Sequence, residues 1–272
     1  MTKTIYLCNG FVKQDGGTGY CYRDPALICA ENGFTPMTTI WGDLTLDAQN
    51  SEGGYDLDKY LAKLDDLTNY PKDCWAFIDL EGAGWMLTPD NFSEKLIENY
   101  KEVLEATKFK RPDMKIGFYR VAPLGNWCTY STTDSLDSIQ AKNKAMSSLM
   151  GLVDFVMPEI YIGSRDYDLP GIMWGLRGLL SEAKNYGKPV IPILAPYYLK
   201  DIALISGITA AGFEYTQEQL FTIDMPPKVF RMYLEQLTAL DVFSVAIWGA
   251  GNYPWDEKKQ PWITELLDWA KN

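Results

Sequence analysis

Two carboxylates, Asp79 and Glu81, stand two residues apart at the end of the apolar run 74–78, and Gly82 follows them. The apolar run is typical of a short strand that is buried on both faces. Because side chains alternate across a strand, we expect both acids to point to the same face. In such a crowded pair one carboxyl group tends to stay protonated while its neighbour is ionised, which suits a general acid beside a base or a polar stabiliser.

A purely structural interpretation competes with the catalytic one, because Asp-x-Glu is a common tripeptide and acids can cap the loop after a strand. Carboxylates at the end of a buried strand cost stability unless something uses or satisfies them. In parallel sheets and barrels, active sites are built at the carboxyl ends of the strands. We therefore favour a catalytic role for the pair.

The composition excludes several classes of function. The chain has 36 Asp and Glu against 25 Lys and Arg, a net charge of -11, which argues against nucleic acid or an anionic membrane as a partner. It contains no histidine, which excludes Ser-His-Asp catalysis, Cys-His catalysis and the usual zinc sites. We expect no metal and no cofactor.

The cysteines predict free thiols rather than a disulfide framework. They form no CxxC pair, and the chain opens into a strand with no signal peptide in view. Together with the lack of an apolar run of membrane-spanning length, this predicts a soluble protein, cytoplasmic or released by a non-classical or phage route. The oligomeric state is open. The cysteines are Cys8, Cys21, Cys29, Cys74 and Cys128.

Strand-like and helix-like segments alternate along the whole chain without a linker or a change in composition. This alternation predicts one α/β domain over residues 1–272 with a parallel sheet. The polar and aromatic groups that end the strands, and the lack of a dinucleotide fingerprint, favour a TIM-like (β/α) barrel over a doubly wound sheet. The predicted strands cover 5–10, 37–42, 74–80, 114–121, 153–163, 189–198 and 242–249. The predicted helices cover 25–32, 56–70, 133–150, 171–186, 226–240 and 261–271. A further long helix is predicted to open at 88, and 200–225 is expected to be loop and short helices.

The predicted strand 153–163 carries polar groups to its end in the same way as the strand before Asp79. Its Glu159 and Tyr161 lie two positions apart and therefore on one face. Glu159 has three interpretations: a structural partner for Arg120 or Arg165, a hydrogen-bond acceptor for substrate, or a second catalytic carboxylate. We favour the contact with substrate.

The order of these strand endings resembles the animal-type hyaluronidases. The resemblance rests on Phe-Ile-Asp-Leu-Glu at 77–81, Gly-Phe-Tyr at 117–119, Met-Pro-Glu-Ile-Tyr at 157–161 and Ala-Ile-Trp-Gly at 246–249. It is colinear over almost the whole chain and strong only at the strand ends. It implies a distorted (β/α) barrel of about seven or eight strands and hydrolysis of β-linked N-acetylhexosamine polymers, so a carbohydrate polymer or oligosaccharide is the expected partner.

The resemblance also implies residue roles. Glu81 would be the general acid and later the base, and Asp79 would hold the substrate's own N-acetyl group, whose carbonyl oxygen acts as the nucleophile. Two same-face acids this close cannot flank a glycosidic bond from opposite sides, so substrate assistance agrees with their spacing. The resemblance further implies a set of substrate-binding residues: Tyr161, Trp248, Tyr119 and a tyrosine after the proline-rich strand, Tyr197 or Tyr198.

The chain departs from that family's pattern at several positions. Glu159 stands where the family usually has a small residue, and Gly-Ala-Gly-Trp at 82–85 replaces a Trp-Arg-Pro. Basic residues that could bind the carboxylates of hyaluronan are few near the predicted cleft. Two alternatives therefore stay open: a catalytically inactive carbohydrate-binding barrel, and a two-carboxylate glycosidase that uses Glu159.

Overall fold

The structure is a computed structural model, and the part of the chain that it describes forms two compact units. Unit 1 combines Met1–Pro36, Ile160–Met173 and Ile193–Asn272, and unit 2 combines Met37–Glu159 and Trp174–Pro192. The residues described are 2–9, 25–40, 57–64, 72–80, 86–125, 130, 136–161, 169–196, 225–248 and 261–272.

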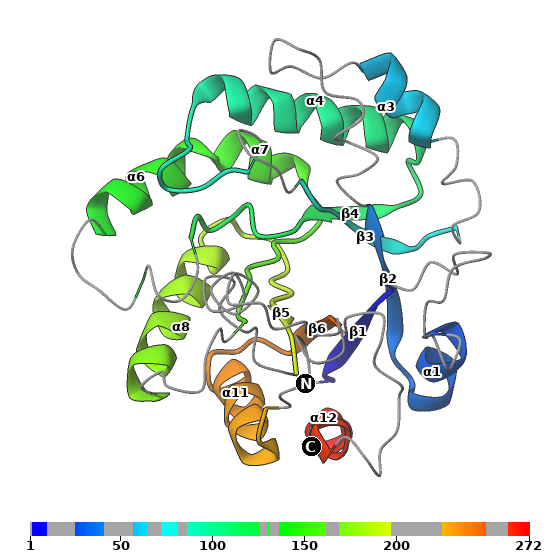
Figure 1. The fold of residues 1–272 in the computed structure, drawn as a ribbon, viewed down its shortest axis with the longest axis vertical. Helices are drawn as coiled ribbons and strands as arrows, with labels where there is room; N and C mark the ends of the chain where they lie inside the picture. The colour runs from blue at the N-terminus through cyan, green and yellow to red at the C-terminus, as the bar shows by residue number, and fades with distance from the viewer. Residues whose placement is uncertain are drawn as a thin grey trace, which may run out of the picture. The chain divides into compact units, whose positions relative to one another are not determined.

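Three parallel strands form the sheet of unit 2 in the order β2, β3, β4 (Figure 1). They are β2 (Thr35–Ile40), β3 (Trp75–Ile78) and β4 (Lys115–Phe118). Ile78 of β3 is in register with Ile40 of β2 on one side and with Phe118 of β4 on the other. Their carboxyl ends therefore lie at one edge of this sheet, as the sequence predicts for a parallel α/β fold.

Side chains of β3 and β4 alternate between two packed faces. On one face the ring of Trp75 lies 5.5 Å from that of Phe155, and the ring of Phe77 lies 6.1 Å from that of Tyr119. On the other face Phe118 packs edge-on against Tyr100 of helix α4 (Glu94–Lys110), with ring centroids 5.1 Å apart. Both faces are buried, which explains why these strands read as continuous apolar runs.

Helix α4 begins later than the sequence predicts. Ser93 is its N-cap and accepts a hydrogen bond from the amide of Leu96 at 3.2 Å, whereas the expected start lay at residue 88. The side-chain oxygen of Thr88 instead accepts the amide of Asn91 at 3.0 Å and closes a separate turn. A local side-chain hydrogen bond thus competes successfully with the helix.

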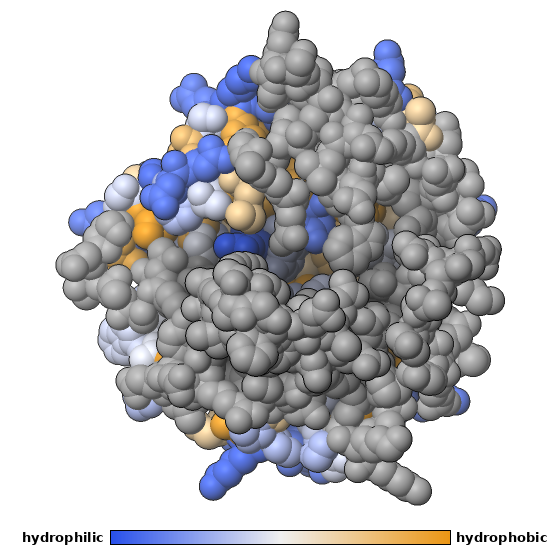
Figure 2. Space-filling view, viewed as in Figure 1, coloured by the Kyte–Doolittle hydropathy of each residue, from blue (hydrophilic) through white to orange (hydrophobic). Residues whose placement is uncertain are grey.

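The charged positions of α4 are solvated, and hydrophilic residues (blue) are interspersed with hydrophobic ones near α4 and α6 (Figure 2).

One predicted helix proves to be two. The segment 133–150 contains α6 (Leu136–Ala145) and α7 (Ser147–Leu152), separated at Met146. The amide of Met146 is shared between the carbonyls of Lys142 and Asn143, and its side chain is fully buried. The tightened turn redirects the chain so that Met146 enters the core. The described part of unit 2 also contains α3 (Leu57–Leu64) and the part of α8 (Leu169–Lys184) that follows Met173.

Over its described residues, 153–161, the predicted strand 153–163 forms isolated bridges and no continuous strand. Tyr119 pairs with Met157, and Val156 pairs with Val190, each in parallel. Pro158, Pro189 and Pro192 have no amide hydrogen, so this region cannot form a continuous ladder. For the same reason the predicted strand 189–198 shrinks to β5 (Ile193–Leu194).

Unit 1 has its own parallel strands, in the order β1, β6, β5. Tyr6 of β1 (Thr4–Asn9) is in register with Ala246 of β6 (Ser244–Trp248), which also pairs with Ile193 of β5. In the described residues of unit 1 the helices are α1 (Pro25–Asn32), α11 (Pro227–Ala239), α12 (Pro261–Lys271) and the first turn of α8.

Aromatic contacts hold the last two helices of unit 1 together. Phe230 of α11 packs edge-on against Trp262 of α12 at 5.7 Å, and the indole N–H of Trp269 donates to the hydroxyl of Thr238 at 2.9 Å. These contacts bury large apolar rings while satisfying one of their polar atoms.

A parallel α/β architecture is thus confirmed, with six strands among the described residues. Closure into a barrel of seven or eight strands, and a single domain over 1–272, stay predictions. The expected loop 200–225 lies almost wholly outside the described residues. No helix in the described ranges is both long and apolar enough to span a bilayer.

Candidate active site

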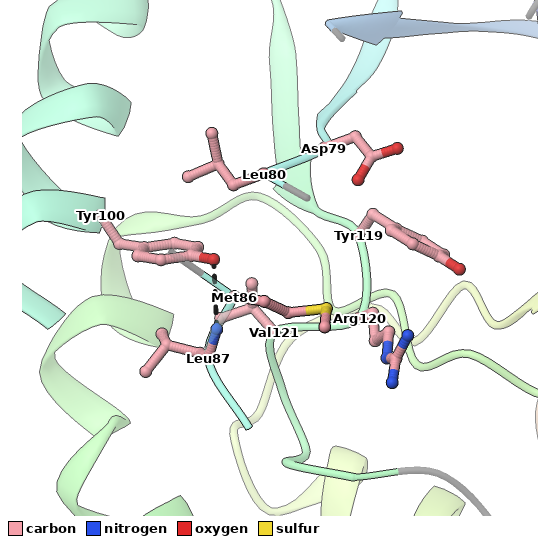
Figure 3. A pocket seen from close by; sticks show the side chains of 8 residues that line it. All are labelled: Asp79, Leu80, Met86, Leu87, Tyr100, Tyr119, Arg120 and Val121. Atoms are coloured by element: carbon pink, nitrogen blue, oxygen red, sulfur yellow. Dashed lines mark hydrogen bonds between the residues drawn. The ribbon is translucent and has the colours of Figure 1, made fainter. Parts of the chain in front are cut away.

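Asp79 directly follows β3 and is held at the strand end by the backbone. Its amide donates to the carbonyl of Ile40 at 3.0 Å, and only 7% of the residue is exposed. Its carboxylate extends to the same side as Tyr119, whereas Leu80 points to the opposite side, toward α4 (Figure 3). The alternation expected from the sequence therefore places this acid on the face that also carries Phe77.

A small hollow, partly open to solvent, lies beside Asp79 in unit 2 (Figure 3). The amide of Leu87 donates to the hydroxyl of Tyr100 at 3.5 Å and fixes one wall. Half of the lining residues have aliphatic or thioether side chains, and the polar groups come from three strand-end residues and from Tyr100 of α4. The lining residues are Asp79, Leu80, Met86, Leu87, Tyr100, Tyr119, Arg120 and Val121.

Glu159 is brought into this site from a distant part of the chain. The hydroxyl of Tyr119 donates to its Oε2 at 2.8 Å, and Nε of Arg120 lies 3.4 Å from the same oxygen. The side chain of Glu159 is 10% exposed and that of Arg120 is 31% exposed. Tyr119, Arg120 and Glu159 therefore form one cluster, in which a largely buried carboxylate is compensated by a positive charge and a hydroxyl donor.

The backbone of Arg120 is in the left-handed region, with φ of 60°. A residue with a Cβ atom is uncommon there, and such a conformation costs on the order of 1 kcal/mol or more. The amide of Arg120 donates to the carbonyl of Met157 at 3.1 Å, so tertiary pairing holds the strained turn. This conformation directs the chain away from β4 immediately after Tyr119.

Two further predicted site residues lie together in unit 1. The rings of Tyr161 and Trp248 are stacked, with centroids 5.9 Å apart and planes inclined by 25°. Tyr161 is 7% exposed, and Trp248 is half-buried at the end of β6. A stacked, partly accessible aromatic pair at a strand end offers an apolar surface suited to a sugar ring.

The structure therefore collects the described predicted residues into two groups, one in each unit. Asp79, Tyr119 and Glu159 belong to unit 2, and Tyr161 and Trp248 belong to unit 1. The other predicted site residues, Glu81, Tyr197 and Tyr198, lie outside the described residues.

Arg120 is the site residue that the sequence did not identify as one. One feature of the sequence indicated that Arg120 could belong to the site, its position directly after Tyr119 at a strand end. Arg120 was also one of two candidate partners for Glu159. The structure shows that it pairs with Glu159, whereas Arg165, the other candidate, lies outside the described residues. Within those residues there is no group of three or more Cys, Asp or Glu side chains that could hold a metal ion. Cys8, Cys29 and Cys74 are free thiols, as predicted.

No protein-family model matches the chain, and no curated protein matches its sequence. Solved structures do resemble it. Bee venom hyaluronidase in a monoclinic crystal form matches with a TM-score of 0.68 at 15% identity, over 99% of this chain and 100% of that one. The same enzyme in complex with a hyaluronic acid tetramer matches with a TM-score of 0.62 at 14% identity, over 99% and 96%.

A bacterial structure also matches, less closely. It is the spore cortex-lytic enzyme SleL of Bacillus cereus, with a TM-score of 0.50 at 15% identity, over 89% of this chain and 61% of that one. At these identities the likeness concerns architecture and not activity. The chain is similar in fold to bee venom hyaluronidase over nearly its whole length.

Proposed function

We propose that the protein is a retaining glycoside hydrolase that cleaves β-linked N-acetylhexosamine-containing glycans with the help of the substrate's own acetamido group. The observation that carries the proposal is the position of Asp79: a buried carboxylate at a strand end, beside a hollow that Tyr119 and Arg120 also line. The similarity in fold to bee venom hyaluronidase supports it.

In the proposed first step, Glu81 donates its proton to the glycosidic oxygen. The carbonyl oxygen of the acetamido group attacks the anomeric carbon, the bond to the leaving sugar breaks, and an oxazolinium ion forms. Asp79 accepts a hydrogen bond from the acetamido N–H and stabilises the positive charge that develops there. In the second step Glu81 takes a proton from water, which attacks the anomeric carbon and opens the ring of the intermediate.

The aromatic residues have binding roles in this proposal. Tyr161 orients the acetamido group, and the ring of Trp248 supports the sugar from its apolar face. Tyr119 contacts substrate near Asp79, and Tyr197 or Tyr198 completes the floor. Glu159 contacts substrate rather than taking part in bond cleavage.

A second candidate, a two-carboxylate glycosidase, is favoured by one observation. Glu159 is joined to Tyr119 by a hydrogen bond of 2.8 Å, so a further carboxylate belongs to the site that holds Asp79. In that mechanism Glu159 would serve as the nucleophile or as a base that activates water.

Release of reducing ends from defined N-acetylhexosamine polymers tests the proposal. We expect turnover of chitin-type or peptidoglycan-type chains by the wild-type protein, and a loss of about a hundredfold or more in Glu81→Gln. If the protein binds such chains without releasing reducing ends, it is a carbohydrate-binding barrel and the proposed function is wrong.

A further inference from the structure

We propose that the ion pair between Arg120 and Glu159 determines specificity: it binds an uncharged polar substituent of the glycan and disfavours a carboxylate. The inference rests on the proposed function, because it assigns the substrate class of the same site. It gives Arg120 a role in substrate selection.

The ligand groups that the Arg120–Glu159 pair can bind depend on which of its atoms already have partners within the protein. Oε2 of Glu159 accepts a hydrogen bond from the hydroxyl of Tyr119 and lies 3.4 Å from Nε of Arg120 in an ion pair. Within the described residues, Oε1 of Glu159 and both Nη atoms of Arg120 have no partner. The pair therefore presents one strong acceptor beside several donors. An amide or a hydroxyl group, which can donate and accept at once, matches this arrangement.

The backbone at Arg120 indicates that its side chain is needed. Glycine would adopt its φ of 60° without strain, yet the position carries a long cationic side chain. Strained conformations of this kind cluster at sites of function. The carboxylate of Glu159 is largely buried, whereas the side chain of Arg120 is partly exposed and therefore accessible to a ligand.

The charge balance of the site disfavours an anionic ligand. Arg120 compensates Glu159, and a second acid, Asp79, lies on the lining of the same hollow as Arg120. A substrate carboxylate would meet Oε1 of Glu159 and the charge of Asp79 in a partly buried setting, where like charges repel strongly. Repulsion of a wrong ligand is a common source of specificity.

Direct binding tests this inference independently of hydrolysis. Calorimetric titrations would compare an N-acetylchitooligosaccharide with a hyaluronan oligosaccharide of equal length. The wild-type protein should bind the neutral sugar about tenfold or more tightly. In Glu159→Gln this preference should shrink about tenfold, because one repelling charge is lost while the shape is kept. Arg120→Gln should weaken binding of the neutral sugar and should weaken binding of the hyaluronan oligosaccharide still more.

Two additional variants make the outcome decisive. Glu235→Gln removes the exposed ion pair of Arg231 and Glu235 in unit 1 and should leave the preference unchanged. Arg120→Lys keeps the charge and should keep the preference for the neutral sugar, which provides a readout if Glu159→Gln fails to fold.

An unchanged preference in Glu159→Gln, a wild-type preference for hyaluronan, or binding of neither sugar overturns the inference. If Glu159→Gln does not fold, loss of the preference in Arg120→Lys overturns it. Selective binding without any release of reducing ends by the wild-type protein would instead refute the proposed function and leave this inference standing.

Discussion

The hydroxyl of Tyr119 donates a 2.8 Å hydrogen bond to Oε2 of Glu159, although the two residues lie 40 positions apart in the chain. Tyr119 also pairs through its backbone with Met157, two residues before Glu159. Side chains two positions apart lie on one face, so this bridge carries Glu159 to the face of Tyr119. The contact brings Glu159 against Tyr119, which lines the hollow beside Asp79.

Removal of this hydroxyl should weaken both stability and substrate binding. Tyr119→Phe should lower the free energy of unfolding by about 1–2 kcal/mol, because a hydrogen bond to a largely buried carboxylate is lost. We also expect a higher KM with a smaller change in kcat. Urea denaturation of Tyr119→Phe, Glu159→Gln and the double variant measures the coupling between the two side chains. Strictly additive effects would show that the hydrogen bond contributes nothing.

The three acids should differ in their effect on kcat. Glu81→Gln should remove nearly all activity, about a hundred- to ten-thousand-fold, and Asp79→Asn should also be severe. Glu159→Gln should keep measurable turnover with a raised KM. The substitutions are nearly isosteric, so the melting temperature serves as a control for folding. The two-carboxylate mechanism would be favoured by the opposite pattern. In that case Glu159→Gln would lower kcat as much as Glu81→Gln does, and Asp79→Asn would lower it only slightly.

The proposed mechanism predicts retention of configuration. Attack by the acetamido oxygen and then by water inverts the anomeric carbon twice, so the first product should have the same anomeric configuration as the substrate. Proton NMR during the first minutes of hydrolysis identifies that anomer before it equilibrates. A product of opposite configuration would indicate direct attack by water, with Glu159 as its base.

The core beneath the site should not tolerate a methyl group at Gly117. A Cβ atom added there would lie 2.5 Å from Cε2 of Phe155, a buried ring that also packs against Trp75. Gly117→Ala should therefore destabilise the protein by about 1–3 kcal/mol. The matched control is Gly151→Ala in helix α7, where the added atom meets nothing within 4 Å. That variant should be as stable as the wild type or up to about 1 kcal/mol more stable. Equal melting temperatures for the two variants would contradict the packing at Phe155.

Stability should fall at alkaline pH. The hydroxyls of Tyr130 and Tyr186 have a pKa above the ordinary tyrosine value of 10.0, and the thiol of Cys8 has a pKa above the ordinary cysteine value of 9.0. Burial is the main cause in each case, because it disfavours the charged form. Above about pH 9 the unfolded chain therefore releases protons that the folded chain keeps, and the free energy of unfolding decreases as the pH rises. This stabilisation is complete below that pH and is lost progressively above it.

Thermal melting between pH 8 and about pH 10.5 measures the effect. Tyr186→Phe removes one of these groups, along with its 3.0 Å hydrogen bond to the carbonyl of Asn143, so it should melt lower at pH 8 and depend less on pH. A melting temperature that is independent of pH over this range would show that these groups titrate alike in the folded and unfolded chains.

Much of the fold followed from the sequence because periodicity is a local property. Apolar runs predicted the parallel strands, and the end of one such run predicted that Asp79 would lie at the end of a strand, β3. Strong local signals also gave the right bounds for the helices Pro25–Asn32 and Pro261–Lys271. The predicted helix start at residue 88 was wrong, because the side chain of Thr88 closes a separate turn there in place of the first turns of a helix.

Contacts between distant residues were decided by the tertiary structure alone. The sequence offered Arg120 and Arg165 equally as partners of Glu159, and only the pairing of the chain around Tyr119 and Met157 brought Arg120 to that carboxylate. The left-handed backbone of Arg120 carries no sequence signal of its own, because tertiary hydrogen bonds stabilise it against local preference. The position of Asp79 at a strand end was therefore predictable from one segment, whereas its surroundings depended on strands that meet only in the folded protein.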